Sequence, residues 1–198
     1  MKKIKLFFSI AILATLLFAA CKPKEPEYEY IPPTPQEIGV EINGVVWSPY
    51  NMGGQTMASP YAHLMFASTP ENYGEYCRLT NAACPKGWRV PTAQEFKTLF
   101  LDTKKVYSEW TTEKYVKGRR FIDKMSDNTI FLPAAGFYRD GLTERLGEGQ
   151  IGCYLSSTNI NDKLAYVLLF YNDNDLYNDI EINSANDKCR ISLRCVAE

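Results

Sequence analysis

Histidine is nearly absent from this chain, since His63 is the single histidine among its 198 residues. Imidazole-based metal centres and Ser-His-Asp catalysis need that side chain, so the sequence disfavours both. A strong charge of either sign is also lacking, because 22 basic residues face 23 acidic ones and the net charge is −1. Nucleic-acid-binding domains are usually basic. We therefore expect a protein that is not an enzyme and has no nucleic-acid partner.

Long apolar runs are confined to the start of the sequence. Three early lysines precede the apolar run 6–18, and Ala19-Ala20 stand directly before Cys21. This run is shorter than the roughly 20 residues that span a bilayer, and its flanks are typical of a secretory signal. The cysteine after two small residues resembles a bacterial lipoprotein signal, which implies that Cys21 is acylated; ordinary secretion without a lipid is the alternative. We expect residues 1–20 to be a signal peptide and the protein to be anchored by lipid at the outer membrane or cell surface of a Gram-negative bacterium.

Proline is concentrated in the next segment, residues 21–37. Five prolines fall there, interleaved with lysine and glutamate. Proline fixes its own backbone angle and biases the preceding residue toward extended conformations, so this segment predicts a semi-rigid spacer. Residues 38–198 remain for one folded domain with its own core.

The patterns within residues 38–198 predict an α+β fold. Asn43-Gly44 between two β-type runs is a strong hairpin signal. Thr92 and Glu95 form a capping-box pattern before a helix expected over 93–101. The last third has strand patterns over 164–171, 179–183 and 189–196. We expect a curved, mostly antiparallel sheet with one or two short helices and long loops.

Five local motifs follow one another in an order and spacing that resemble a known family. They are Ile42-Asn43-Gly44-Val45-Val46-Trp47, Cys84-Pro85-Lys86-Gly87-Trp88-Arg89-Val90-Pro91-Thr92, Leu132-Pro133-Ala134-Ala135-Gly136-Phe137-Tyr138-Arg139, Gly152-Cys153-Tyr154-Leu155-Ser156-Ser157 and Ser192-Leu193-Arg194-Cys195-Val196. Together they resemble the Fibrobacter succinogenes major paralogous domain, over residues from about 38 to 198. The resemblance implies a C-type lectin-like fold and an envelope location, with no established activity. Leu155 and Arg190 depart from the family pattern, which usually has tryptophan and glycine there.

Five cysteines follow Cys21, so at least one is free or unusually paired. Cys189 and Cys195 are expected on one strand, about 20 Å apart, which is too far for a disulfide. Because Cys84 and Cys195 both fall in motifs of the resemblance, we expect them to pair. Cys77 is then expected to pair with Cys189 or Cys153, and a local Cys77–Cys84 bridge is the rival.

One cluster of oxygen-bearing side chains offers a candidate ligand site. It consists of Tyr171, Asn172, Asp173, Asp175 and Tyr177. Alternating carboxylates and amides can bind calcium, the one cofactor this cluster suggests, although the spacing lacks the glycine and distal glutamate of a helix-loop-helix calcium loop. A solvated turn between strands is the alternative, and tyrosines that merely cover the sheet are the alternative to a binding surface.

These observations favour a binding protein over a catalyst. We expect a surface binding or adhesion module for a glycan or protein partner. The alternatives are a structural or assembly component of a surface complex, which would carry a large apolar patch, and an envelope enzyme, which would need a cleft with converging ionisable groups.

Overall fold

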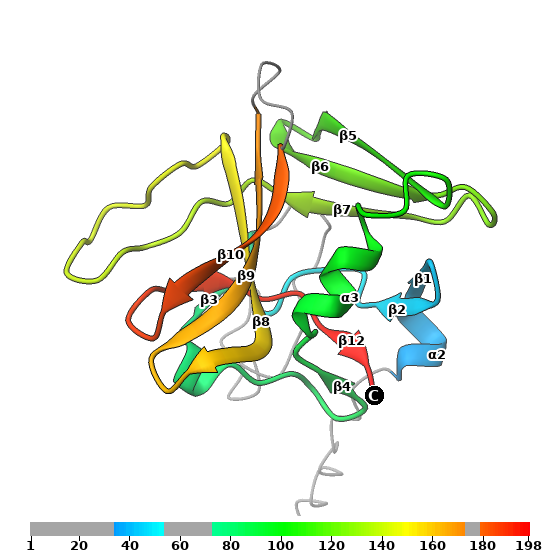
Figure 1. The fold of residues 1–198 in the computed structure, drawn as a ribbon. Coiled ribbons are helices and arrows are strands. Elements are labelled where there is room, and N and C mark those ends of the chain that lie inside the picture. Colours follow the sequence, from blue (N-terminus) through cyan, green and yellow to red (C-terminus); the bar gives the residue numbers. More distant parts are fainter. Residues whose placement is uncertain (1–33, 54–72, 173–178) are drawn as a thin grey trace, which may run out of the picture. The chain divides into compact units, whose positions relative to one another are not determined.

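The computed structural model describes residues 34–53, 73–172 and 179–198 (Figure 1). The chain divides into two units, Met1–Ile31 and Pro32–Glu198, and all described residues belong to the second. The predicted signal peptide, Cys21 and most of the predicted spacer lie outside the described residues. Within the described ranges, no helix is both long enough and apolar enough to cross a membrane.

The described part opens with the predicted β-hairpin. Strands β1 (Val40–Ile42) and β2 (Val45–Trp47) pair antiparallel. Asn43 and Gly44 both have positive φ, 48° and 80°, as a type I′ turn requires. The hairpin belongs to a four-stranded sheet in the order β1-β2-β12-β4, with β4 at Trp88–Arg89 and β12 at Val196–Ala197.

A five-stranded sheet in the order β10-β9-β8-β11-β3 follows. Its strands are β3 (Tyr76–Cys77), β8 (Ile151–Asn161), β9 (Leu164–Tyr171), β10 (Ile180–Asn186) and β11 (Ile191–Ser192). All neighbours are antiparallel except β11 and β8. The predicted strands near 164–171 and 179–183 are present as β9 and β10.

The single strand predicted over 189–196 is wrong. That segment contains two strands, β11 and β12, which belong to different sheets. Between them, the Met52 amide donates to Leu193 O at 2.8 Å, and the Cys195 amide donates to Ser48 Oγ at 3.1 Å. These bonds satisfy the backbone where it leaves one sheet for the other.

A three-stranded antiparallel sheet completes the fold. It contains β5 (Val106–Glu113), β6 (Val116–Asp123) and β7 (Thr129–Pro133), in that order. A two-residue turn joins β5 to β6, and both of its residues, Lys114 and Tyr115, have positive φ. The sequence does not signal this hairpin, because two-residue turns of this kind usually contain glycine or asparagine.

The helices are short. Helix α3 (Ala93–Thr98) has the predicted capping box, in which the Glu95 amide donates to Thr92 Oγ1 and the Glu95 carboxylate accepts from the Thr92 amide. It ends three residues before the expected Leu101. A single helical turn, α2 (Pro35–Ile38), occupies the end of the segment expected to be spacer, and η2 (Leu79–Asn81) is a 3-10 turn. The fold is therefore mostly β-sheet with a few short helices, consistent with the α+β class.

The core lies where α3 meets the sheets. Helix α3 lies beside β8 and β9 (Figure 1), and its Phe96 packs against Trp47 of β2 with ring centroids 5.4 Å apart. Phe121 of β6 and Tyr154 of β8 both contact Phe170 of β9. These five side chains are fully buried, and burial of a large apolar side chain contributes about 1.5–3 kcal/mol.

Arg194 is fully buried in this core. Its guanidinium donates to Ser48 O at 3.0 Å and to Phe131 O at 2.6 Å, so it links the end of β2 to β7. Tyr154 Oη donates to Pro133 O at 2.9 Å and lies beside the same guanidinium. Burial lowers the pKa of Arg194 to about 10, so the side chain stays positively charged at neutral pH.

The cysteines agree with one prediction and contradict another. Cys84 and Cys195 form a disulfide, with Cα atoms 6.1 Å apart. Cys77, Cys153 and Cys189 are free, so the expected second bridge from Cys77 is wrong, as is the rival Cys77–Cys84 bridge. Cys77 packs with Cys84 and Cys195, whereas Cys153 and Cys189 pack together in a separate apolar cluster. The fold therefore keeps Cys77 away from both expected partners.

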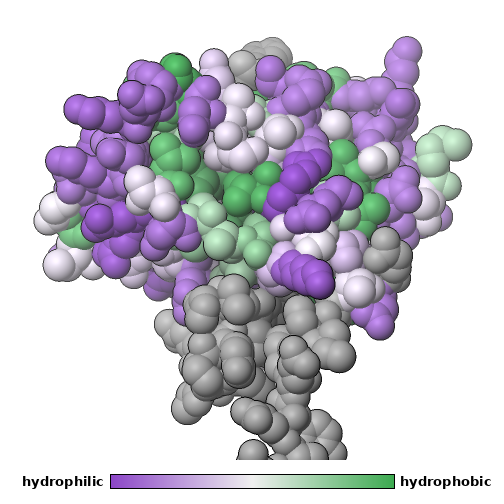
Figure 2. All heavy atoms as spheres, turned by 90° about the horizontal axis from the view of Figure 1, so that it is seen from below, coloured by the Kyte–Doolittle hydropathy of each residue, from purple (hydrophilic) through white to green (hydrophobic). Residues whose placement is uncertain are grey.

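One face of the described part is largely polar. On the face in Figure 2, hydrophilic residues surround smaller hydrophobic areas. Large apolar side chains that remain exposed include Leu101 after α3, Tyr115 in the β5–β6 turn and Met125 in the β6–β7 turn. These side chains come from separate turns along the chain.

Candidate functional site

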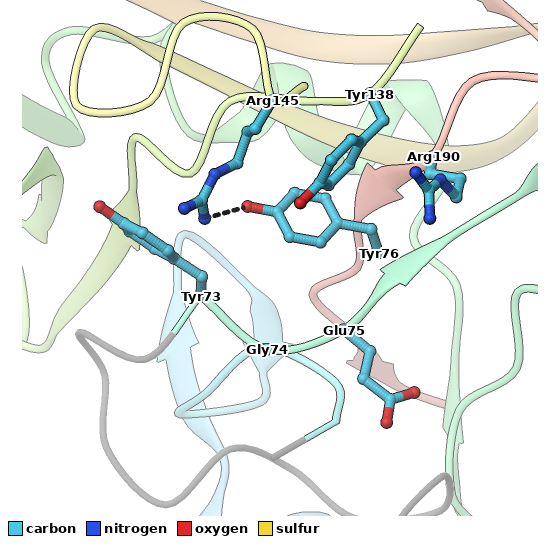
Figure 3. Close-up of a pocket in the computed structure, with 7 residues that line it drawn as sticks. All are labelled: Tyr73, Gly74, Glu75, Tyr76, Tyr138, Arg145 and Arg190. Carbon is cyan, nitrogen blue, oxygen red and sulfur yellow. Dashed lines mark hydrogen bonds between the residues drawn. The ribbon is translucent and has the colours of Figure 1, made fainter. Parts of the chain in front are cut away.

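A hollow of about 500 Å³ lies at the β3 edge of the five-stranded sheet. Its walls consist of aromatic and cationic side chains, with one glycine and one glutamate: Tyr73, Gly74, Glu75, Tyr76, Tyr138, Arg145 and Arg190 (Figure 3). We call this hollow the Tyr/Arg pocket. Its volume falls within the range of small-molecule binding sites.

Three chain segments that are distant in sequence form the pocket. β3 contributes Tyr76, which pairs with Ser192 of β11. Tyr138 and Arg190 form an antiparallel bridge, in which each amide donates to the other's carbonyl at 3.0 Å. Arg145 belongs to the loop that the Phe137–Leu146 bridge closes. Backbone pairing therefore fixes the positions from which these side chains project.

Glycine is required at position 74, just before Tyr76. Its φ is +70°, and a Cβ atom there would lie 2.2 Å from Met52 O. The chain turns tightly at this point and places Tyr73 and Tyr76 on the same hollow (Figure 3). Any side chain at position 74 would strain that turn.

Arginine and tyrosine side chains alternate around the pocket. The Arg190 guanidinium lies 4.2 Å from the centroid of the Tyr138 ring. That ring meets Tyr76 edge-on, with centroids 5.0 Å apart. Arg145 lies over Tyr73 at 5.0 Å and near Tyr76 at 6.0 Å. Such cation–π and edge-to-face contacts hold large, flat side chains in defined orientations.

Tyr76 is anchored by two hydrogen bonds. Its hydroxyl donates to Ala135 O at 2.6 Å and accepts from Arg145 Nη1 at 3.0 Å. Burial raises the pKa of Tyr76 to about 12, against the opposing effect of Arg145. Burial, followed by the nearby Glu148 carboxylate, also raises the pKa of Tyr73. These phenols stay protonated at neutral pH, so they serve as hydrogen-bonding groups and not as bases.

The two pocket arginines differ in their electrostatic partners. Arg145 Nη2 forms an ion pair with Glu148 Oε2 at 2.5 Å, while Arg145 Nε is buried without a hydrogen-bond partner in the described part of the chain. No described carboxylate forms an ion pair with Arg190. Glu75 points away from the rings (Figure 3). Arg190 therefore supplies a positive charge that no described side chain neutralises.

The sequence-based candidate site lies elsewhere. Tyr171 is on β9, which β8 and β11 separate from β3, and its hydroxyl donates to Glu181 Oε1 at 3.3 Å. Burial, followed by the Glu181 carboxylate, raises the pKa of Tyr171 to about 12. Asn172 follows, and its amide donates to Gln150 O at 3.1 Å. Asp173, Asp175 and Tyr177 lie outside the described residues.

The described ranges offer little for metal or thiol chemistry. Within those ranges, no three histidine, cysteine or acidic residues gather closely enough to hold a metal ion. The calcium hypothesis depends mainly on residues outside them. Burial raises the pKa of the Cys77 thiol to about 11, and burial also raises the pKa of Cys153. Both shifts are opposite to those that activate a nucleophilic thiol.

The sequence patterns did not predict the Tyr/Arg pocket. Tyr138 lay within a family-like motif, and Arg190 stood out as a departure from the family pattern. Tyr73 and Tyr76 lay in a polar stretch without periodicity. The departure at Arg190 was the one available signal, since an arginine in place of glycine adds a charged side chain on a strand edge.

A second hollow, of about 590 Å³, lies between α3 and the β9–β10 pair. Its lining includes Ala93, Lys97, Phe100, Leu101, Tyr166 and Ile182. Half of the ten lining residues are apolar, and the two charged ones, Lys97 and Glu181, have opposite signs. This hollow is therefore less suited to bind a polar ligand than the Tyr/Arg pocket.

Comparison with known proteins adds no assignment, since no family model, curated protein or solved structure matches this chain.

Proposed function

We propose that this chain is a lipid-anchored cell-envelope protein whose domain, residues 38–198, binds a glycan or protein partner through the Tyr/Arg pocket. The membrane anchor rests on the lipoprotein-like signal that ends at Cys21. The binding role rests on the pocket, where three tyrosine rings and two guanidiniums converge in about 500 Å³. Tyrosine and arginine are enriched where proteins recognise ligands, because each gives a large contact area together with hydrogen bonds.

The resemblance to the Fibrobacter succinogenes major paralogous domain leads us to propose a C-type lectin-like arrangement for the sheets. The support is that the family-like motifs supply buried core residues. Trp47, Trp88, Leu132, Tyr154 and Arg194 are each 3% exposed or less. Motifs that form the core carry information about fold, whereas the pocket residues, of which only Tyr138 lies in such a motif, determine the ligand.

The anchor has a direct test. Cys21→Ser, expressed in a Gram-negative host, should move the protein from the membrane fraction to the soluble fraction and remove its lipid mass. Cys77→Ser is the control, since Cys77 lies in the folded domain. A Cys21→Ser protein that stays in the membrane fraction would contradict lipid anchoring.

The binding role is tested with the full chain in detergent against a glycan array and against surface proteins in pull-down. We expect a ligand whose affinity falls at least tenfold in Tyr138→Ala, because that ring contacts both Arg190 and Tyr76. Tyr107→Ala is the matched control, since Tyr107 is 48% exposed on β5 and does not line the pocket. Equal losses of affinity in both variants, or no ligand in either screen, would contradict the proposal.

A further inference from the structure

We propose that the Tyr/Arg pocket binds an acidic sugar, a hexuronic acid residue of a glycan, and that Arg190 binds its carboxylate. This inference rests on the proposed binding function and names its ligand class. It follows from three features of the pocket: one arginine without a described carboxylate partner, a lining without aliphatic side chains, and one buried donor, Arg145 Nε, without a described acceptor.

Arg190 is held in place but keeps its hydrogen-bonding edge. Its guanidinium stacks at 4.2 Å from the Tyr138 ring centroid, and the backbone bridge to Tyr138 fixes the base of the side chain. Stacking uses the flat face of a guanidinium, while its N–H groups point outward in the plane. That edge matches the two oxygens of a carboxylate in a bidentate pair.

The charges around the pocket favour a ligand with one negative charge. Glu148 already pairs with Arg145, and Asp140 pairs with Lys188 at 3.0 Å. Arg190 alone among the pocket cations has no described carboxylate partner. A phosphate with two charges would need a second free guanidinium, which Arg145 does not supply. Glu75 is the one carboxylate of the lining, and it points away from the rings and forms no ion pair with Arg190 (Figure 3), so one carboxylate of a ligand would balance the Arg190 charge.

The lining favours a sugar over a peptide. The side chains around the pocket are tyrosine, arginine and glutamate, and none of the seven lining residues is aliphatic. An apolar peptide side chain would find no matching surface there. A pyranose ring has C–H groups that pack on aromatic faces and hydroxyls that need hydrogen-bond partners. The three tyrosine rings provide faces, and in Figure 3 the Tyr138 hydroxyl lies on the side of its ring that faces Tyr76 and Arg145.

Arg145 has a buried hydrogen-bond donor that a sugar could satisfy. Its Nε atom is buried and has no hydrogen-bond partner among the described residues. A buried N–H without a partner is costly, and bound ligands or waters commonly supply the missing acceptor. A sugar hydroxyl or ring oxygen is such an acceptor. Arg145 would thus position the ring while Arg190 binds the carboxylate.

The test compares matched ligands by isothermal titration with the full chain in detergent. The probes are tetrasaccharides of galacturonic acid and of glucuronic acid, each beside its carboxyl-reduced, neutral counterpart. We expect an acidic tetrasaccharide to bind at least tenfold more tightly than its neutral form. Arg190→Gln should reduce its affinity to that of the neutral form, and Arg190→Lys should restore part of the difference.

Arg139→Gln is the matched control. Arg139 is exposed, lies one residue from Tyr138, and loses the same charge on substitution. An equal loss in Arg139→Gln and Arg190→Gln would overturn the inference in favour of general electrostatic attraction. Thermal melting of each variant verifies folding.

The remaining outcomes separate this inference from the proposed function. If neutral and acidic sugars bind equally and Tyr138→Ala weakens both, the pocket is a glycan site and the acidic-sugar inference is wrong. If a sulfated sugar binds while the uronic acids do not, the carboxylate assignment is wrong. If no array ligand depends on Tyr138, both the inference and the proposed binding site fail.

Discussion

Arg190 and Arg194 are four residues apart, yet their surroundings are opposite. Arg194 is fully buried, and backbone carbonyls of Ser48 and Phe131 accept its hydrogen bonds. Arg190 lies on the rim of the Tyr/Arg pocket, stacked on Tyr138 and without a described ion-pair partner. The chain crosses from one sheet to another between them. The difference separates an arginine that stabilises the fold from one that is available to a ligand.

The largest effect on stability is expected beside Arg194, at the Cys84–Cys195 disulfide. The bond links residues 111 positions apart, and a loop of that length predicts stabilisation of about 4 to 5 kcal/mol in the chain-entropy model. Urea unfolding of Cys84→Ser/Cys195→Ser should show a loss of that order. Cys77→Ser, at a free cysteine, should lose less than half as much. A loss of unfolding free energy below about 1 kcal/mol in the double variant would contradict the chain-entropy model.

The next largest effect is expected at Arg194 itself. Arg194→Met keeps the volume but leaves the buried carbonyls of Ser48 and Phe131 without donors, at about 1–3 kcal/mol each. We expect the free energy of unfolding to fall by about 3 kcal/mol in total. Arg190→Met is the matched control and should change it by less than about 0.5 kcal/mol, as for a typical surface substitution. Equal losses at the two positions would remove the distinction between them.

Much of the core could be predicted from the sequence, because the signals for its turns and helix start are local. Asn43-Gly44 determines a hairpin turn, and Thr92 with Glu95 determines a helix start. The Cys84–Cys195 bridge followed from the family resemblance. These features depend on residues close in sequence or on recognised motifs.

The Tyr/Arg pocket could not be predicted in the same way. Its residues come from 73–76, 138–145 and 190, and only long-range pairing brings them together. The prediction of one strand over 189–196 was wrong, because the alternation of apolar and polar residues continues through the point where the chain passes from one sheet to another. The β5–β6 hairpin was missed because its turn uses Lys114-Tyr115 in place of glycine or asparagine. Tertiary contacts, and not local propensity, determine these features.

A smaller effect is expected at the Arg89–Glu95 ion pair. Arg89 donates to both oxygens of Glu95, at 2.8 and 2.5 Å, while Glu95 also caps α3. Glu95→Gln can keep the cap but loses the ion pair, at a cost of about 0.5–1 kcal/mol at pH 7. Urea unfolding of both proteins gives this difference.

The same pair predicts a pH dependence. Burial alone would raise the pKa of Glu95, but the Arg89 and Thr92 hydrogen bonds outweigh it and lower the folded-state pKa. A carboxyl group whose pKa is lowered by folding stabilises the fold at a pH above its unfolded-state pKa of about 4.3. That contribution is lost as the pH falls through the folded-state pKa. The stability difference between wild type and Glu95→Gln should therefore shrink as the pH falls below about 4.3. A difference that is unchanged between pH 7 and pH 3 would contradict the ion-pair assignment.

The smallest effect on stability, and the largest on binding, is expected at Arg190. Arg190→Gln should leave the melting temperature nearly unchanged while it removes the preference for acidic over neutral tetrasaccharides. Tyr76→Phe is a finer probe, since it deletes the hydroxyl that joins Ala135 O to Arg145. We expect it to cost about 1 kcal/mol of stability, as a part-buried hydrogen bond does, and to weaken binding less than Arg190→Gln.

The most direct test of the central claim follows the arginine side chains themselves. The Nε–H resonances of the full chain in detergent would be recorded by nuclear magnetic resonance during titration with tetragalacturonate and tetraglucuronate, and assigned with Arg190→Gln and Arg194→Met. We predict that the Arg190 and Arg145 signals shift and saturate with at least one of these ligands, while the Arg194 signal stays in place. Arg190 and Arg145 signals that stay fixed with both ligands, or an Arg139 signal that shifts as far as that of Arg190, would contradict the assignment of the Tyr/Arg pocket as the binding site.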